Sequence, residues 1–174
     1  MSPGKGPASE READGDAWQF HWDRPPPTPL LRSVLAYWES RRQGREMPAR
    51  ADLDPLHIPK LLPRIMLFDV LREPLDFRYR LIGTGVCERL EQDTTGMRMS
   101  DFPKKAAPSV IYRFASDLCT RRRPGWTRLP YIGPDRFIRY AVSVGAPLSA
   151  DGRTVDMLFY GVDFIAGNPD AEAP

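Results

Sequence analysis

Apolar residues recur every three or four positions along two stretches of the chain, which is the spacing of one buried helix face. The first stretch is TPLLRSVLAYWESRRQG, in which Thr28 can cap a helix and Gly44 can end it. The second stretch is APSVIYRFASDLCTRRR, residues 107–123. Its apolar face is made by Val110, Ile111, Phe114 and Leu118. We therefore predict a long helix in each stretch.

Two short apolar runs between these helices have the pattern of paired strands. IMLFDVL, residues 65–71, is typical of a buried strand, and FRYRLIG follows it after the turn REPLD. Alternation along the second run predicts that Phe77, Tyr79 and Leu81 share one face of a sheet. The two runs together predict an antiparallel hairpin.

Three further strand-like runs follow the second helix. They are WTRLPYI, RFIRYAVSVGAPL and TVDMLFYGVDFI, which span residues 126–132, 136–148 and 154–165. Asp151-Gly152 between the last two runs predicts a second hairpin. Pro130 cannot donate a ladder hydrogen bond, so we expect the first of these runs to be an edge strand.

This order of elements predicts an α+β domain built on one antiparallel sheet of five strands with flanking helices. Residues 28–165 form this domain, and residues 28–44 form its N-terminal amphipathic helix. Residues 1–27 are polar and rich in Gly, Pro, Asp and Glu, so we expect a disordered N-terminal tail, in which Trp18, Phe20 and Trp22 are candidates for docking onto the domain. Residues 166–174 are expected to be a short C-terminal tail.

Length and composition place the chain among soluble single domains. It has 174 residues, of which 41% are hydrophobic and 28% are charged. No stretch reaches the ~18 apolar residues of a membrane-spanning helix, and the first twenty residues have no apolar core, so we expect no secretory signal. Two cysteines are too few for a disulfide framework, which favours a cytoplasmic location.

Charge is distributed unevenly along the chain. Residues 98–139 hold ten Lys/Arg and three Asp/Glu, a local charge of +7, and residues 149–174 hold one Arg and five acids, a local charge of −4. The segment RRRPGW beginning at Arg121 combines cations with Trp126, as single-stranded nucleic acid sites do. An anion- or nucleic-acid-binding adaptor is therefore one alternative function. Cations are also favourable at a helix C-terminus, so the cluster has a structural explanation too.

The glycine pair Gly83-x-Gly85 follows a predicted strand, but it makes a poor phosphate loop. A dinucleotide fingerprint needs a third glycine where Glu88 stands, and it needs a parallel βαβ unit. The chain also has no GxxxxGK[ST] motif. We expect these glycines to let the backbone turn.

Catalytic and metal-binding signals are few. There is no GxSxG, HExxH or CxxC motif, and Asp54 before Pro55 is typical of a helix cap rather than of a metal ligand. His57 is the only histidine of the predicted domain, and Cys119 is expected to be a packed thiol. We expect no metal site and no catalysis. A small α+β enzyme stays a third alternative, which would need His57 or a pocket carboxylate from among Asp69, Asp156 and Asp163.

The order of elements and several of the segments resemble a bacterial family of stand-alone PAS-like proteins. The segments that carry this resemblance are LAYWESRRQGREMPARADLDP, LPRIMLFDVL, DFRYRLIGTGVCERLEQDTTG and PLSADGRTVDMLFYGVDF. The resemblance covers about Leu30 to Phe164. It implies a five-stranded antiparallel sheet cupped by helices, and a non-catalytic sensory or regulatory module that binds a small ligand or a protein partner.

The resemblance also guides expectations about cofactors and the binding site. His57 lies before the first strand and Cys87 has no NCRF-like surroundings, so neither haem nor flavin is supported and the ligand stays unknown. Strand alternation and helix periodicity suggest the cavity candidates Tyr79, Arg80, Phe114, Leu118, Tyr140, Val142, Met157 and Phe159. We also predict a homodimer through the apolar stripe Leu31, Val34, Leu35 and Trp38.

Overall fold

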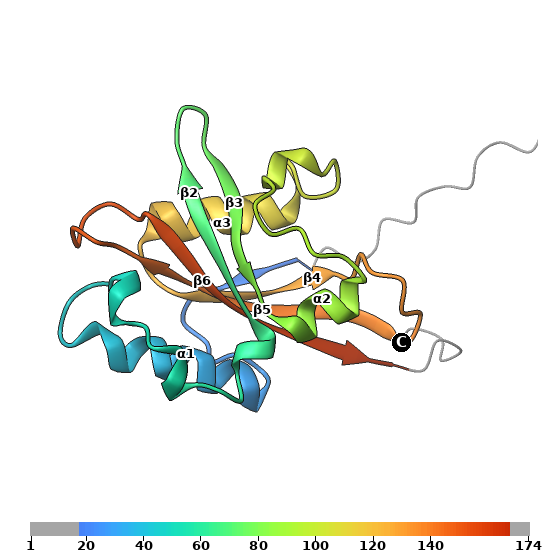
Figure 1. Cartoon of the computed structure of the whole chain (residues 1–174), viewed down its shortest axis with the longest axis horizontal. Coiled ribbons are helices and arrows are strands. Elements are labelled where there is room, and N and C mark those ends of the chain that lie inside the picture. Colours follow the sequence, from blue (N-terminus) through green and yellow to red (C-terminus); the bar gives the residue numbers. More distant parts are fainter. Residues whose placement is uncertain (1–17, 168–174) are drawn as a thin grey trace, which may run out of the picture.

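The structure is a computed structural model and describes residues 18–167. Six antiparallel strands form one sheet in the order β1-β4-β5-β6-β2-β3 (Figure 1). The strands are β1 (Phe20–His21), β2 (Ile65–Leu71), β3 (Asp76–Ile82), β4 (Gly125–Pro130), β5 (Ile138–Leu148) and β6 (Met157–Ala166). The helices are α1 (Pro29–Arg42), α2 (Thr84–Leu90) and α3 (Val110–Arg121), with four 3-10 turns, η1 (Arg50–Asp52), η2 (Pro55–His57), η3 (Leu62–Arg64) and η4 (Met99–Asp101). The predicted antiparallel α+β fold is confirmed, with one additional strand.

The additional strand lies in the segment that we expected to be a disordered tail. Phe20 pairs with Thr127 and His21 pairs with Trp126. The ring centroids of Phe20 and Trp22 lie 5.2 and 5.9 Å from that of Phe114. Residues 18–27 therefore differ from the prediction of disorder, because Phe20 and Trp22 pack, partly buried, against the hydrophobic core. Residues 1–17 of the predicted tail, and residues 168–174, lie outside the described residues.

Helix α1 begins as its sequence predicts. The backbone N–H of Leu31 donates to the Oγ1 of Thr28, 3.4 Å away, and Pro29 occupies the first turn. The helix ends at Gln43, which has a left-handed conformation with φ 51°, and Gly44 continues in the same region with φ 82°. One face of the helix is buried against β5 and β6.

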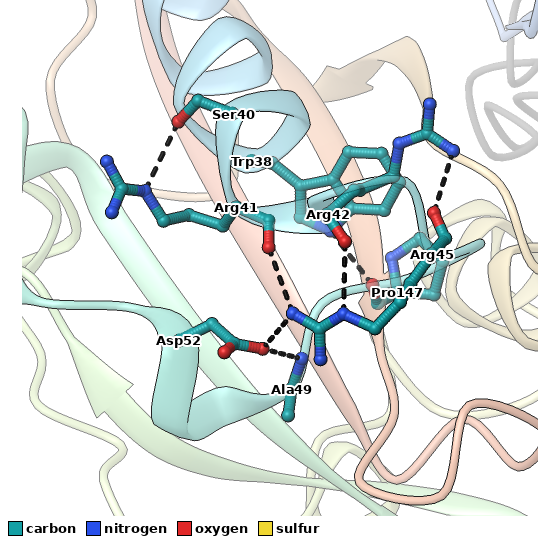
Figure 2. A network of polar contacts seen from close by, with 8 residues as sticks. All are labelled: Trp38, Ser40, Arg41, Arg42, Arg45, Ala49, Asp52 and Pro147. Carbon is teal, nitrogen blue, oxygen red and sulfur yellow. Dashed lines mark hydrogen bonds and ion pairs between the residues drawn. The ribbon is translucent and has the colours of Figure 1, made fainter.

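A polar network holds the C-terminal end of α1 on the sheet (Figure 2). The indole Nε1–H of Trp38 donates to the carbonyl oxygen of Pro147 in β5, 2.9 Å away. The guanidinium of Arg45 donates to the carbonyl oxygens of Arg41 and Arg42, at 3.1 and 3.0 Å, and to Asp52, at 2.7 Å. Helix-terminal carbonyls that have no intrahelical partner are satisfied in this way.

Helices cover both faces of the sheet. A Cβ added at Gly161 of β6 would lie 2.8 Å from Val34 of α1, and a Cβ added at Gly145 of β5 would lie 2.4 Å from Leu118 of α3. Gly145 pairs with Tyr160, the neighbour of Gly161, so the two glycines point to opposite faces. We call these the α1 face and the α3 face. Glycine at both points lets a helix approach the sheet closely.

A bulge in β3 changes the face on which its side chains lie. Leu67 pairs with Leu81 and the next residue, Phe68, pairs with Tyr79, so that Arg80 is an extra residue. Tyr79 therefore lies on the α3 face, but Leu81 lies on the α1 face and is 40% exposed. The prediction that these two side chains share one face was wrong.

The predicted edge strand is only partly an edge. Strand β1 pairs with β4 at Trp126 and Thr127. Pro130 lies beyond the last β1 pair, and on its other side it pairs with Tyr140 of β5. The proline thus stands where no second neighbouring strand needs its backbone donor, as the chemistry of proline requires.

Candidate functional site

A cavity of about 80 Å³ lies between the α3 face of the sheet and the segments that cover it. A single water needs ~10–15 Å³, so the space suits several waters or one small molecule. Its walls come from five strands, from α2 and α3, and from the segment that precedes α3. Most of the lining is apolar and includes Met66, Val86, Leu90, Ile111, Leu129 and Val162.

Two buried tyrosines belong to this mostly apolar wall. Tyr79 of β3 is 3% exposed and Tyr160 of β6 is 5% exposed. Their rings pack on Phe68, with centroids 4.8 and 5.0 Å away. Neither hydroxyl has a hydrogen-bond partner among residues 18–167. Burial raises the pKa of both groups, so each stays a neutral donor at pH 7.

A buried lysine lines the same cavity. Lys105 precedes α3, is 6% exposed, and holds its Nζ 4.4 Å from the ring centroid of Phe102 and 4.9 Å from that of Tyr79. No carboxylate within the described part of the chain forms an ion pair with it. Burial lowers the pKa of this amine.

The cost of burying the charge of Lys105 can be compared with the free energy that its ring contacts return. Taking one ion out of water costs several kcal/mol even after the protein relaxes. A cation–π contact returns about 0.5–2 kcal/mol. The Nζ of Lys105 keeps some accessible surface, so it bears part of this penalty, and the two ring contacts offset some of that part. Sequence patterns did not reveal this residue, because the neighbouring Lys104 is exposed and nothing in the chemistry of the two side chains distinguishes them.

The predicted cavity residues are dispersed in the structure. Tyr79 lines the cavity, whereas Phe114 and Leu118 are fully buried core residues of α3 that pack near Gly145. Arg80 is an exposed bulge residue, with Nη1 3.8 Å from a carboxylate oxygen of Asp69. Of these four side chains, only Tyr79 contributes to the cavity.

The predictions on β5 and β6 chose the opposite face. Tyr140 and Val142 alternate with Ala141 and Ser143, and it is the latter two that line the cavity. Phe159 and Met157 alternate in the same way with Tyr160, which lines the cavity. Both strands are buried on both faces, so alternation alone could not identify the cavity side.

Phe159 lines a second cavity of about 80 Å³, which lies on the α1 face. The Tyr37 hydroxyl on its wall donates to the carbonyl oxygen of Asp54, 2.9 Å away, and accepts from the backbone N–H of Asp54, 2.8 Å away. The other polar residues of this wall are paired too, since Arg50 donates to the carbonyl oxygen of Leu53 and Asp54 accepts from Leu56, so we treat the space as a packing gap.

The apolar stripe that was predicted to form a dimer interface packs against the chain's own sheet. Leu31, Val34 and Trp38 are at most 1% exposed, because they cover the chain's own sheet. Leu35 alone of the four is partly accessible. A second copy would therefore have to contact other residues.

Gly83 and Gly85 allow close packing rather than phosphate binding. A Cβ on Gly83 would lie 2.4 Å from the carbonyl oxygen of Leu62, and one on Gly85 would lie 3.0 Å from that of Pro63. Gly83 caps α2, and the two glycines bring this helix against η3. Neither glycine has a positive φ, so the expected role in turning the backbone is not what requires them, and the close contact with η3 is.

The candidate catalytic groups lie apart from the cavity. His57 is exposed, and Asp54 caps η2 by accepting from the backbone N–H of Leu56, 2.9 Å away. Burial raises the pKa of Cys119 to about 12, so it is a packed thiol. Cys119 thus lacks the lowered pKa of a reactive thiol, and the Nε2 of His57 lies 3.9 Å from Asp54 on the exposed surface, outside this cavity.

The three carboxylates of the enzyme alternative have structural partners. Asp69 accepts from the guanidinium of Arg78 at 2.9 and 3.0 Å. Asp163 lies 3.7 Å from Arg64, and Asp156 accepts from the backbone N–H of Ala150 at 2.6 Å. Within residues 18–167, no group of three His, Cys, Asp or Glu side chains has the arrangement of a metal site.

Ion pairs occupy the arginine triplet of the nucleic-acid alternative. Arg121 lies 3.8 Å from Asp117. Arg122 pairs with Glu46, and Arg123 lies 3.0 Å from Asp23. This cluster is thus partly neutralised.

Among the described helices, none combines the length and the apolar composition that crossing a membrane requires.

Comparison with known proteins identifies the family. A family model described as PAS domain matches residues 27–130, and no curated protein matches. A sensory box sensor histidine kinase from Vibrio cholerae is 18% identical, with 64% of this chain and 91% of that chain covered and a TM-score of 0.46. A fungal LOV domain photoreceptor is 14% identical, with 76% and 90% covered and a TM-score of 0.46. On the match to the family model, which covers more than half of its length, this chain belongs to the PAS domain family.

Proposed function

We propose that this protein is a non-catalytic sensory or regulatory PAS module that binds a small molecule in the cavity on the α3 face. The observation that carries the proposal is the combination of apolar walls with polar groups that have no protein partner. Such a combination is typical of ligand sites, in which a few polar groups orient a mostly apolar ligand. PAS domains are typically sensory or regulatory modules, and this agrees with the proposal.

The cavity size limits what can bind. Pockets for drug-sized ligands occupy ~300–1,000 Å³. The cavity is about 80 Å³, which favours a molecule of a few non-hydrogen atoms over a large planar cofactor. The cytoplasmic location, the homodimer and the signalling partner predicted from the sequence stay parts of this proposal. Sedimentation equilibrium at micromolar concentration tests the homodimer directly.

Native mass spectrometry of the gently purified protein, compared with a denaturing spectrum of the same sample, tests ligand binding. We expect an excess mass that disappears on denaturation. The variant Ser143→Leu, which fills the cavity from β5, should lack it, whereas Ala36→Leu on the exposed side of α1 should retain it. Circular dichroism confirms that both variants fold. The same excess mass in folded Ser143→Leu, or none in the unaltered protein, would contradict binding in this cavity.

A further inference from the structure

We propose that the ligand of this cavity is a small monocarboxylate with an apolar tail, whose negative charge is met by Lys105. This inference rests on the proposed function and specifies the chemical class of its ligand. Three observations carry it: the unpaired buried ammonium, the two unpaired tyrosine hydroxyls, and the apolar character of the remaining wall.

The first step concerns the charge. Lys105 is 6% exposed, and throughout the part of the chain that the structure describes no acid is paired with it. Buried charges in proteins are ordinarily paired. Arg78 and Arg89 are far more exposed than Lys105, and each of them has an acid beside it, Asp69 and Asp135 respectively. An anion bound in the cavity would supply the negative charge that no described side chain places beside this lysine.

The second step concerns the kind of anion. Tyr79 and Tyr160 line the same cavity and have free hydroxyls, which donate well to a carboxylate oxygen. With the hydroxyl of Ser143, which lines the same cavity, the wall carries four such donor groups, enough for the two oxygens of one carboxylate. A dianion such as phosphate or a dicarboxylate would bury a second charge for which this wall has no cation.

The third step concerns the rest of the ligand. Side chains such as Val86, Leu90 and Ile111 surround the polar groups, and an apolar tail gains free energy by contacting them. The volume of about 80 Å³ restricts this tail to a short aliphatic chain or one small ring. Butanoate represents the chain, and benzoate represents the ring, which would need the walls to move apart.

The experiment compares each acid with its neutral isostere. Isothermal titration of the full chain with butanoate, butanamide, benzoate and benzamide, at matched pH and salt, should show at least one acid binding about ten- to a hundredfold more tightly than its amide. Lys105→Met keeps the length of the side chain and removes its charge, so it should abolish this preference. Lys104→Met removes a charge from the adjacent exposed lysine and should leave the preference unchanged.

The outcomes separate this inference from the proposed function. Equal binding of acids and amides, abolished by Ser143→Leu, would overturn the carboxylate ligand and leave the cavity as the binding site. If neither acid binds and an excess mass is still present in the native spectrum, the carboxylate ligand is overturned and the cavity stays the binding site. Acid binding that survives Ser143→Leu would overturn both. The acid-to-amide ratio is measured in the unaltered protein, so the test does not depend on how Lys105→Met folds.

Discussion

Replacing Gly161 by alanine tests how α1 is held on the sheet. The new Cβ would lie 2.8 Å from Cγ2 and 3.0 Å from Cγ1 of Val34, which is 1% exposed. Carbon atoms in favourable contact lie ~3.5–4.0 Å apart, so the helix has to move. Such overpacking costs about 1–3 kcal/mol, and the lower entropy of the unfolded alanine chain returns about 0.4–1 kcal/mol. We expect Gly161→Ala to lower the free energy of unfolding by about 1–2 kcal/mol.

A second substitution shows whether this cost arises at the expected contact. Val34→Ala removes two buried methyl groups and should lower the free energy of unfolding by about 2 kcal/mol. In the double variant the alanine at 161 occupies the space that Val34 leaves. The loss in the double variant should therefore be smaller than the sum of the two single losses by about 1 kcal/mol or more.

Urea unfolding followed by far-ultraviolet circular dichroism measures these free energies. The matched control pairs Gly161→Ala with Leu35→Ala, because Leu35 lies on the same helix but is only half-buried. That pair should be additive to within about 0.5 kcal/mol. Additivity of the Val34 and Gly161 pair would refute the reasoning, since α1 would then not rest on its own sheet through this contact.

Three further predictions concern single side chains. In a Cys87→Ser background, Cys119 should resist a maleimide at pH 8 until the protein is unfolded, because burial raises its pKa to about 12; rapid labelling of the folded protein, seen by mass spectrometry, would contradict this. Asp76→Ala removes the acceptor of the Ser100 hydroxyl, 2.6 Å away, from a site only 6% exposed. It should lower the free energy of unfolding in urea by about 2 kcal/mol, and an unchanged urea midpoint would count against the bond. Backbone hydrogen bonds hold the pKa of Asp151 far below its ordinary value of 3.8, so it stabilises the fold above that pH and progressively less below it. The difference in melting temperature between the unaltered protein and Asp151→Ala should therefore narrow from pH 6 to about pH 2, and a constant difference would argue against this linkage.

Local sequence determined most of the secondary structure. The N-terminus of α1 follows from Thr28 and Pro29, whose cap and first-turn preferences act within a few residues of chain. Apolar periodicity located α3, and the Asp151-Gly152 turn located the last hairpin, in which Leu148 pairs with Met157. Each signal is local, so it could be read without knowing what lies nearby in space. The order of these elements was sufficient to predict the antiparallel sheet.

Tertiary structure decided on which face of the sheet each site residue lies. The extra residue Arg80 reverses the alternation of β3 between Tyr79 and Leu81, and a bulge depends on the partner strand. Strands β5 and β6 are buried on both sides, so their sequences do not mark which face meets a cavity. Residues 20–21 form a strand because they pair with the edge of β4, and because the ring of Phe20 packs on Phe114 of α3.

Lys105 shows most clearly the difference between what the sequence predicts and what only the folded structure decides. Its sequence neighbour Lys104 has the same chemistry and is exposed, whereas Lys105 is buried. The difference depends on where the segment before α3 packs across Phe102 and Tyr79, which come from separate parts of the chain. The sequence by itself therefore determined most of the helices and strands and their order, through short-range backbone and periodicity preferences, but not strand β1. Only the folded structure decided that Lys105 is buried with no acid beside it among residues 18–167, because burial depends on all the segments that pack around a side chain.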